Sequence, residues 1–254
     1  TTLMTLPLFS SRTVPRMAKI ALALYMGWFI FSSMDLSSGV YAAYARYISA
    51  DGSFTLEYVF ILLGEGLIGL IIGFYIQVIF AAFSTAGQFF AFQMGLSASE
   101  VYDSLSQVEN PLMGQFLNFM AMVFFLQENW IQRLFLTGLK ESFVTLNAFS
   151  ILDNSQFLAL FMMKSLTILF KDALIIALPI MGSLFLINVT VGILSKAAPQ
   201  MNLLSEGFPI LMLVSYFLLF VLIPHLEEFF MGTFTDGFVQ IGRLVAGLKA
   251  SGGM

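Results

Sequence analysis

The sequence predicts an all-α membrane protein. Hydrophobic residues make up 59% of the 254 residues and charged residues only 10%, and the mean hydropathy is +0.90. Soluble domains carry about 25% charged residues, so a soluble fold of this composition would have too few polar side chains to cover its surface. Long apolar runs alternate with polar turns that lipid does not accommodate. The chain therefore faces lipid or other subunits over most of its area.

Composition also excludes several classes of function. The chain has no cysteine, which excludes disulfides, thiolate catalysis, iron–sulfur clusters and zinc–thiolate sites. No basic run indicates nucleic-acid binding. The first residues lack the ordered regions of a secretory signal. Because the chain opens inside the apolar run 3–9 without an initiator methionine, we expect the native protein to begin upstream.

The N-terminal part is predicted to hold a turn and one helix. Pro7 and Pro15 bracket residues 8–14, which is typical of a turn. The apolar tract 17–34 follows, and the cations at its start indicate a cytoplasmic end. Aromatic residues that favour membrane boundaries occupy the next loop, and these are Tyr41, Tyr44, Tyr47 and Phe54.

The second tract, residues 57–94, is too long for one perpendicular crossing. A continuous helix would rise roughly 55 Å, against a hydrocarbon core of about 30 Å. The tract therefore either breaks near residues 86–88 or extends well beyond the lipid. Within it, Gly69 and Gly73 form a small-xxx-small pair suited to close helix contact.

Glu65 lies inside the apolar part of this second tract. A carboxylate at membrane depth predicts proton handling or ion pairing. The structural alternatives are a pair with Lys164 or Lys171, or a helix end that rises out of the lipid.

A polar interlude covers residues 95–110, for which an ordinary extramembrane loop is the simplest interpretation. Its notable members and the proline that follows are Gly95, Leu96, Ser97, Glu100, Asp103, Ser106, Gln107 and Pro111. The apolar tract 112–126 then predicts another helix, and residues 129–149 form an amphipathic, helical stretch of interfacial character.

The C-terminal part predicts a helical hairpin with arms at residues 156–194 and 208–224. An amphipathic segment, 227–249, follows. The first arm carries Lys164, Lys171 and Asp172 on a shared face. A lone cation facing lipid costs about 2.5–3.5 kcal/mol, so these charges are predicted to lie against protein or water.

A charged, proline-broken turn joins the two arms and must meet water or other proteins. Its defining residues are Lys196, Pro199, Gln200, Met201, Asn202 and Glu206. A plain connecting turn is the alternative.

The single histidine, His225, is predicted to be a polar cap at a helix end. No catalytic constellation or cofactor motif is recognisable, so we expect no enzyme activity, metal or cofactor.

Two segments carry a resemblance to a known family. The turn Leu194-Ser195-Lys196-Ala197-Ala198-Pro199-Gln200-Met201-Asn202 and the run Gln93-Met94-Gly95-Leu96-Ser97 resemble motifs of the FliR/SctT export-gate proteins. Lys196 stands where the family usually has arginine. Asp103 precedes serine rather than the usual proline, and Glu128-Asn129-Trp130 replaces a common Asn-Gly-His. Gly207-Phe208-Pro209 is closer to the flagellar branch.

The resemblance implies a structural, pore-forming subunit of the flagellar type III export gate, which passes unfolded flagellar proteins across the bacterial inner membrane. It implies FliP-type, FliQ-type and FlhB-type partners, and a helical channel displaced toward the periplasm. Residues 1–254 would form one domain of long kinked helices, with N-terminal helices over 1–155 and the hairpin and tail over 156–254. In the family, the loop at about residues 95–110 acts as a pore plug.

Alternatives from other classes remain. One is a self-contained secondary transporter that uses Glu65 with Lys164 or Lys171 as coupling groups, although the repeated halves expected of a carrier are not recognisable. Within the same family, the equivalent subunit of a virulence type III secretion system is a further alternative. A membrane-embedded enzyme has the weakest support, for lack of a catalytic constellation.

Overall fold

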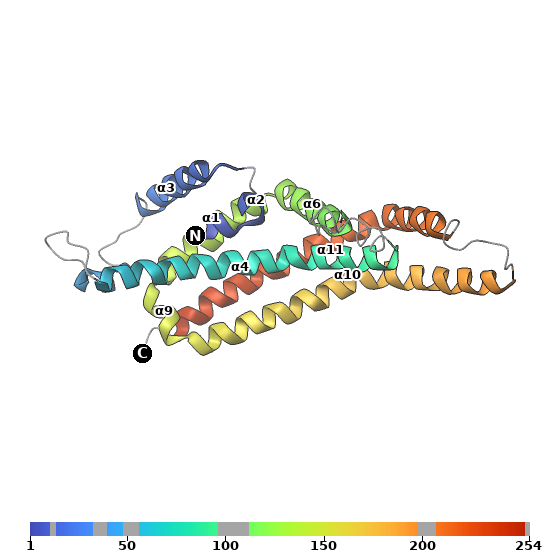
Figure 1. Ribbon diagram of the computed structural model, residues 1–254. Coiled ribbons are helices and arrows are strands. Elements are labelled where there is room, and N and C mark those ends of the chain that lie inside the picture. Colours follow the sequence, from blue (N-terminus) through green and yellow to red (C-terminus); the bar gives the residue numbers. More distant parts are fainter. Residues whose placement is uncertain (11–13, 33–39, 48–55, 96–111, 198–206, 252–254) are drawn as a thin grey trace. The chain divides into compact units, whose positions relative to one another are not determined.

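The computed structural model describes residues 1–10, 14–32, 40–47, 56–95, 112–197 and 207–251. Within these ranges every regular element is helical (Figure 1). Three helices are long and apolar enough to cross a membrane, judged by length and composition: Leu56–Gln93, Ser155–Ala197 and Pro209–Leu248. The predicted all-α, membrane-associated class is therefore confirmed.

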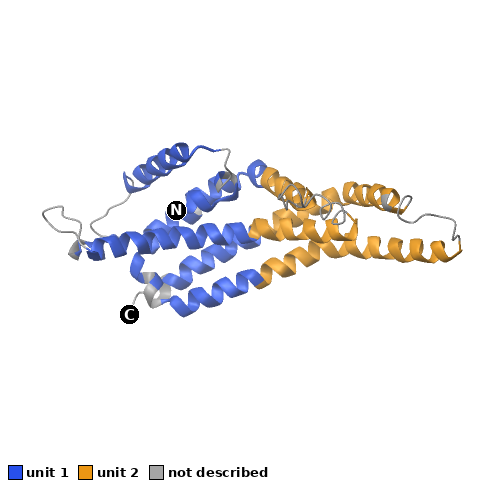
Figure 2. Cartoon of the chain, viewed as in Figure 1, with its two compact units in different colours: residues 1–78, 125–166, 235–254 blue, residues 79–124, 167–234 orange. Residues whose placement is uncertain are grey.

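The helices group into two compact units, coloured separately in Figure 2. Unit 1 comprises residues 1–78, 125–166 and 235–254, and unit 2 comprises residues 79–124 and 167–234. The elements in chain order are α1 (Thr2–Thr5), α2 (Pro7–Ser10), α3 (Arg16–Ser32), the 3₁₀-helix η1 (Val40–Arg46), α4 (Leu56–Gln93), α6 (Leu112–Gln127), α7 (Trp130–Arg133), the π-helix η3 (Leu134–Leu139), α8 (Lys140–Thr145), α9 (Ala148–Asp153), α10 (Ser155–Ala197) and α11 (Phe208–Ser251).

The long second tract is one unbroken helix, α4, of 38 residues. Of the two alternatives, the break near residues 86–88 is therefore wrong. Gly87 does not break the helix but leaves room for a neighbouring backbone. A Cβ placed on it would lie 2.6 Å from the Cα of Gly114. The glycine lets α4 and α6 approach closely within unit 2, and the helix runs on.

The C-terminal part also differs from the expectation. The arm 208–224 and the segment 227–249 are a single helix, α11, of 44 residues with Pro224 in its interior. An apolar helix tolerates such a proline where neighbouring groups satisfy the backbone. Residues 8–10 belong to the short helix α2 rather than to a turn.

The amphipathic stretch 129–149 is helical, as predicted, but it is not one helix. It begins after Asn129, whose φ of 56° is left-handed, and passes through α7, the π-helix η3 and α8. Leu146 then adopts an extended conformation, and α9 begins at Ala148. The break places the first residues of α9 where they can contact α4 in unit 1.

Unit 1 is held by contacts among α1, α4, the 125–166 segment and the end of α11. Gln77 donates to the carbonyl of Thr5 at 2.6 Å, which links α4 to α1. Trp130 stacks on Phe238 of α11 with ring centroids 4.8 Å apart. These links join segments that are distant in sequence.

Unit 2 has an aromatic core between α4 and α11. Phe83 meets Phe230 edge to face with centroids 4.3 Å apart, and Phe80 lies 5.3 Å from Phe234. Phe230 and Phe234, four residues apart on one face of α11, are both buried. A second buried stripe runs along α10 at helical spacing and consists of Ala173, Ile176, Ala177, Ile180 and Leu184.

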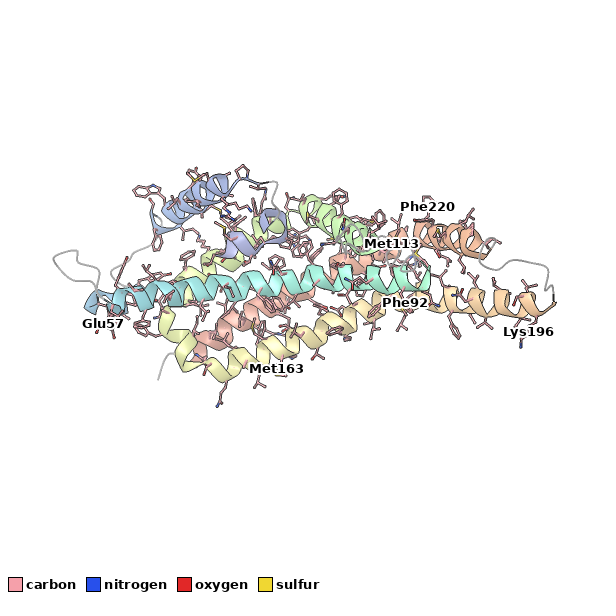
Figure 3. The ribbon with its side chains drawn as sticks, viewed as in Figure 1. Glu57, Phe92, Met113, Met163, Lys196 and Phe220 are labelled. Atoms are coloured by element: carbon pink, nitrogen blue, oxygen red, sulfur yellow. The ribbon has the colours of Figure 1, made fainter. Side chains whose placement is uncertain are left out.

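Large apolar side chains nevertheless remain exposed on the single chain. Figure 3 labels three of them, Phe92, Met163 and Phe220, which are 72%, 69% and 73% exposed. Such side chains project along helices long enough to cross a membrane. Lipid or other protein must cover them.

Candidate functional site

The candidate site in unit 1 is built around the carboxylate of Glu65 on α4. The hydroxyl of Tyr44, from η1, donates a short hydrogen bond to Glu65 Oε1. The same hydroxyl accepts a hydrogen bond of 2.5 Å from the backbone N–H of Ala148, at the start of α9. One buried phenol therefore ties three elements together.

Local structure explains how Tyr44 reaches this position. In a 3₁₀-helix, residues three apart eclipse one another, so Tyr41 and Tyr44 project from the same side of η1. Their rings meet edge to face with centroids 5.5 Å apart, and Tyr44 also lies edge to face with Phe149 at 5.7 Å. This aromatic cluster fixes the direction of the hydroxyl.

Gly64 allows α9 to approach the carboxylate. A Cβ on Gly64 would overlap the Cβ of Ala148 and lie 3.1 Å from its Cα. Only a residue without a side chain fits at this crossing. The Ala148 N–H thus reaches the phenol of Tyr44 because the residue beside Glu65 is glycine.

The phenols of this cluster are held in their neutral form. Burial raises the pKa of Tyr44 well above its ordinary value, and the nearby Glu65 raises it further. Burial, followed by the charge of Glu65, raises the pKa of Tyr41 in the same direction. Tyr44 therefore remains a proton donor to Glu65 throughout the physiological pH range.

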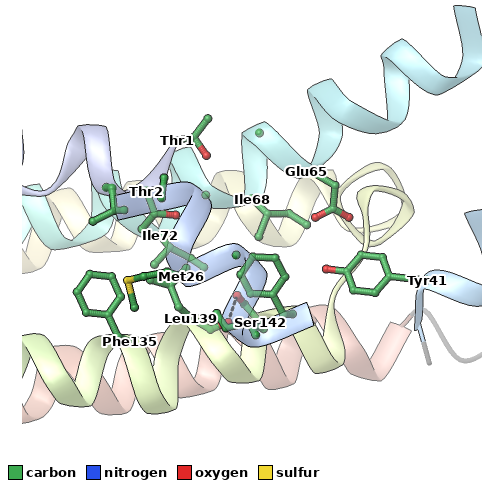
Figure 4. Close-up of a pocket in the computed structure, with 17 residues that line it drawn as sticks. Thr1, Thr2, Met26, Tyr41, Glu65, Ile68, Ile72, Phe135, Leu139 and Ser142 are labelled. Atoms are coloured by element: carbon green, nitrogen blue, oxygen red, sulfur yellow. Dashed lines mark hydrogen bonds between the residues drawn. The ribbon is translucent and has the colours of Figure 1, made fainter. Parts of the chain in front are cut away.

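A cavity of about 310 Å³ opens beside Glu65 within unit 1. Figure 4 shows Glu65 and Tyr41 at one end of it and Met26 and Phe135 at the other. The described residues that line it include Glu65 as the one acidic group and no lysine, arginine or histidine. The remaining lining is mainly apolar, with hydroxyls from Thr1, Thr2 and Ser142.

The predicted partners of Glu65 need correction. Within the described residues, Glu65 accepts a hydrogen bond from Tyr44 rather than from Lys164 or Lys171. Both lysines are exposed side chains of α10, and Asp172 is half-buried. Their placement against other protein stays a prediction.

The predicted glycine pair lies against the N-terminal helix. A Cβ on Gly69 would be 3.2 Å from the backbone nitrogen of Thr2, and one on Gly73 would be 2.8 Å from the Cβ of Thr5. Small residues at these positions let α1 lie directly on α4.

Most of the predicted plug and turn lie outside the described residues, namely Leu96, Ser97, Glu100, Asp103, Ser106, Gln107, Pro111, Pro199, Gln200, Met201, Asn202 and Glu206. Gly95 is described, and its φ of 77° ends α4 in the left-handed conformation that glycine favours. Lys196 is exposed in the last turn of α10 (Figure 3). A cation there interacts favourably with the helix dipole.

His225 does not cap a helix end. It is an exposed residue in the interior of α11, directly after Pro224. Within the described part of the chain, no group of three or more histidine, aspartate or glutamate side chains is arranged to hold a metal ion.

Sequence reasoning missed the residues that surround Glu65. In the sequence alone, Tyr41 and Tyr44 resemble any aromatic residues of a membrane boundary, and nothing distinguishes Ala148 from its neighbours. Their three-residue spacing was the available signal, although a single short loop does not specify which carboxylate its phenols meet. Tyr44 and Ala148 are 104 positions apart, and nothing local indicates their contact.

Comparisons with known proteins identify relatives over most of the chain. It is 32% identical over 220 residues to the flagellar biosynthetic protein FliR of Bacillus subtilis, which covers 85% of this chain and 80% of the relative. It is 29% identical to FliR of Escherichia coli, covering 96% and 88%. It is also 29% identical to the surface presentation of antigens protein SpaR of Shigella sonnei, covering 74% and 75%.

The similarity is not confined to one motif. Residues 1–237 match the family described as Bacterial export proteins, family 1, so the match includes all of α4 and α10 and most of α11. The relatives in this comparison include flagellar proteins and one surface-presentation protein. The chain belongs to family 1 of the bacterial export proteins.

Proposed function

We propose that this protein is a structural, pore-forming subunit of the flagellar type III export gate. In this role it passes unfolded flagellar proteins across the bacterial inner membrane, together with FliP-type and FliQ-type subunits and an FlhB-type neighbour. The assembled complex is displaced toward the periplasm. The family match over residues 1–237 and the FliR relatives support this assignment. The similarity to SpaR makes the equivalent virulence-system subunit the alternative within the family.

The observation that carries the proposal is the surface of α10. This 43-residue helix exposes Lys164 and Lys171 beside apolar side chains such as Met163 and Phe170. Lipid is a poor environment for the lysines, and water is a poor one for the apolar groups. Neighbouring helices can bring polar or acidic groups to the lysines and cover the apolar side chains at the same time. A multi-subunit channel supplies such neighbours.

The segment 95–110 acts as the plug of this channel. It is polar, begins at Gly95 and is followed by Pro111, so removing part of it costs little apolar core. Deletion of residues 97–107 is expected to leave the complex assembled and to raise the permeability of the membrane to ions or small solutes. Normal assembly with unchanged permeability would count against the plug.

The turn after α10 lies at the channel entrance, where Lys196 pairs with carbonyls or a carboxylate of a neighbour. Lys196→Glu is expected to reduce motility and export at matched protein levels, because charge reversal turns attraction into repulsion. Pro199→Ala acts through assembly, since it lets the first arm continue as helix. If Lys196→Glu cells have wild-type motility and export, the turn only connects the two arms and has no role at an entrance.

A secondary transporter finds less support than the export gate. Its proposed coupling depended on Glu65 acting with Lys164 or Lys171, whereas Glu65 bonds to Tyr44. Liposomes that contain the purified chain alone test the carrier directly. Gradient-driven uptake of a small solute in that preparation would favour the carrier over the channel subunit.

A further inference from the structure

We propose that the Glu65 cavity binds an ammonium group attached to a small apolar body. The inference does not depend on the export role. It rests on the shape, lining and charge of the cavity in unit 1, as drawn in Figure 4.

The charge of the site selects a cation. Glu65 is half-buried in a predominantly apolar helix, and one of its oxygens accepts from Tyr44. A neutral phenol stabilises a carboxylate but does not neutralise it. None of the described lining residues is a lysine, arginine or histidine. A carboxylate at membrane depth is stabilised most by a compact cation with hydrogen-bond donors, which describes an ammonium group.

The other lining residues indicate what the rest of the ligand is, namely a small apolar body. Glu65 and Tyr41 mark one end of the cavity, while Met26 and Phe135 mark the other. An ammonium at the first end would meet both the carboxylate and an aromatic ring, which attracts cations through its face. The apolar body would then contact the methionine and phenylalanine. A volume of about 310 Å³ is at the lower end for ligand sites, so the body must be small.

Two sources supply this chemistry: a soluble amine, or the headgroup of an aminophospholipid entering from the bilayer. The probe is n-hexylammonium, and the neutral comparison is 1-hexanol, which has the same alkyl chain. Binding is measured by equilibrium dialysis of the full chain with its co-purifying partners, in nanodiscs of phosphatidylglycerol. Identical nanodiscs without protein give the background partitioning.

Two variants separate charge from space. Glu65→Gln keeps the shape and a hydrogen-bond acceptor for Tyr44 but removes the charge. Gly27→Leu fills the cavity from α3, where a new Cβ would meet nothing within 4 Å. Gly182→Leu is the matched control, because Gly182 also has nothing within 4 Å and is an exposed residue of α10 in unit 2.

We expect wild type and Gly182→Leu to bind hexylammonium above background and at least about tenfold more tightly than hexanol. Glu65→Gln should lose about tenfold or more, and Gly27→Leu should abolish binding. Competition by added phosphatidylethanolamine identifies a lipid headgroup as the natural source, and the absence of competition identifies a soluble amine.

Three results would overturn the inference. The first is that wild type and Glu65→Gln bind hexylammonium with equal affinity. The second is that wild type binds hexanol as tightly as hexylammonium. The third is carbodiimide cross-linking of Glu65 to a lysine of a co-purifying protein without any hexylammonium binding, which would show that a protein cation fills the cavity. Helical circular dichroism of each variant confirms that a loss of binding is not a loss of fold.

Discussion

At the scale of single residues, Tyr44 is the most consequential side chain of unit 1. It is 8% exposed, and its hydroxyl both donates to Glu65 and accepts from Ala148. Removing the hydroxyl leaves a carboxylate and a backbone N–H without this partner in a half-buried setting. Buried polar groups that lose a partner cost more than the bond itself contributed.

Tyr44→Phe is therefore expected to destabilise the protein by about 1–3 kcal/mol, since the ring packing survives and only the hydrogen bonds are lost. Tyr25→Phe is the control, because Tyr25 is 71% exposed on α3. Thermal unfolding in mild detergent, followed by circular dichroism, measures both. Equal melting temperatures for the two variants would show that the Tyr44 hydroxyl is dispensable.

The same phenol predicts a dependence on alkaline pH. The pKa of Tyr44 is raised in the folded protein, so above pH of about 10 the unfolded chain releases the proton first. The contribution to stability is complete below that pH and is lost as the pH rises further. The difference in melting temperature between wild type and Tyr44→Phe should narrow as the pH rises above about 10. A difference that stays constant over this range would contradict the assigned shift.

At the scale of elements, the glycines of α4 decide which helices can lie against it. Gly64 admits α9, Gly69 and Gly73 admit α1, and Gly87 admits α6. Each contact places another backbone where a Cβ would otherwise stand. The four glycines therefore set the packing of α4 within its two units, although glycine weakens a helix intrinsically.

Gly64→Ala and Gly66→Ala form a matched pair two residues apart. At Gly64 the new Cβ overlaps Ala148, whereas at Gly66 the nearest atom is the Cγ2 of Thr1 at 3.6 Å, an ordinary contact. We expect Gly64→Ala to cost about 1–3 kcal/mol through overpacking, and Gly66→Ala to be neutral or stabilising by up to about 1 kcal/mol. Chemical denaturation of each variant checks the difference. Similar stabilities would mean that α9 moves aside without cost.

At the scale of the whole molecule, the exposed apolar surface is the dominant property. Residues such as Trp28, Phe92, Leu213 and Phe220 are each at least 72% exposed. The buried residues of each unit support its helices, but they leave wide apolar faces along α10 and α11. Those faces need lipid or partners.

The protein expressed alone is therefore expected to be unstable, and co-expression with FliP-type and FliQ-type partners should stabilise it. Size-exclusion chromatography in mild detergent, together with helicity by circular dichroism, measures the outcome. A monodisperse, fully helical monomer without any bound partner would contradict the proposed multi-subunit channel. The co-expressed complex serves as the positive control, since it is extracted in the same detergent.

Part of this architecture could be predicted because its cause is local. Composition determined the membrane class, and the apolar tract 112–126 predicted α6 to within a residue because Pro111 precedes it and polar residues follow it. Helical spacing alone places Phe230, Phe234 and Phe238 near one face of the C-terminal segment. Pro224 is also a local signal, since proline usually ends a helix, but here it wrongly predicts a break inside the single helix α11.

The tertiary structure alone decided the contacts that depend on distant residues. Glu65 bonds to Tyr44, 21 positions away, and Tyr44 bonds to Ala148, 104 positions away. Likewise, whether Gly87 breaks α4 or admits α6 depends on Gly114, which a local pattern does not reveal. Composition and periodicity determine that helices form and which faces are apolar, because these follow from each residue and its near neighbours. Which carboxylate meets which phenol, and where a cavity remains, follows from how separate segments pack.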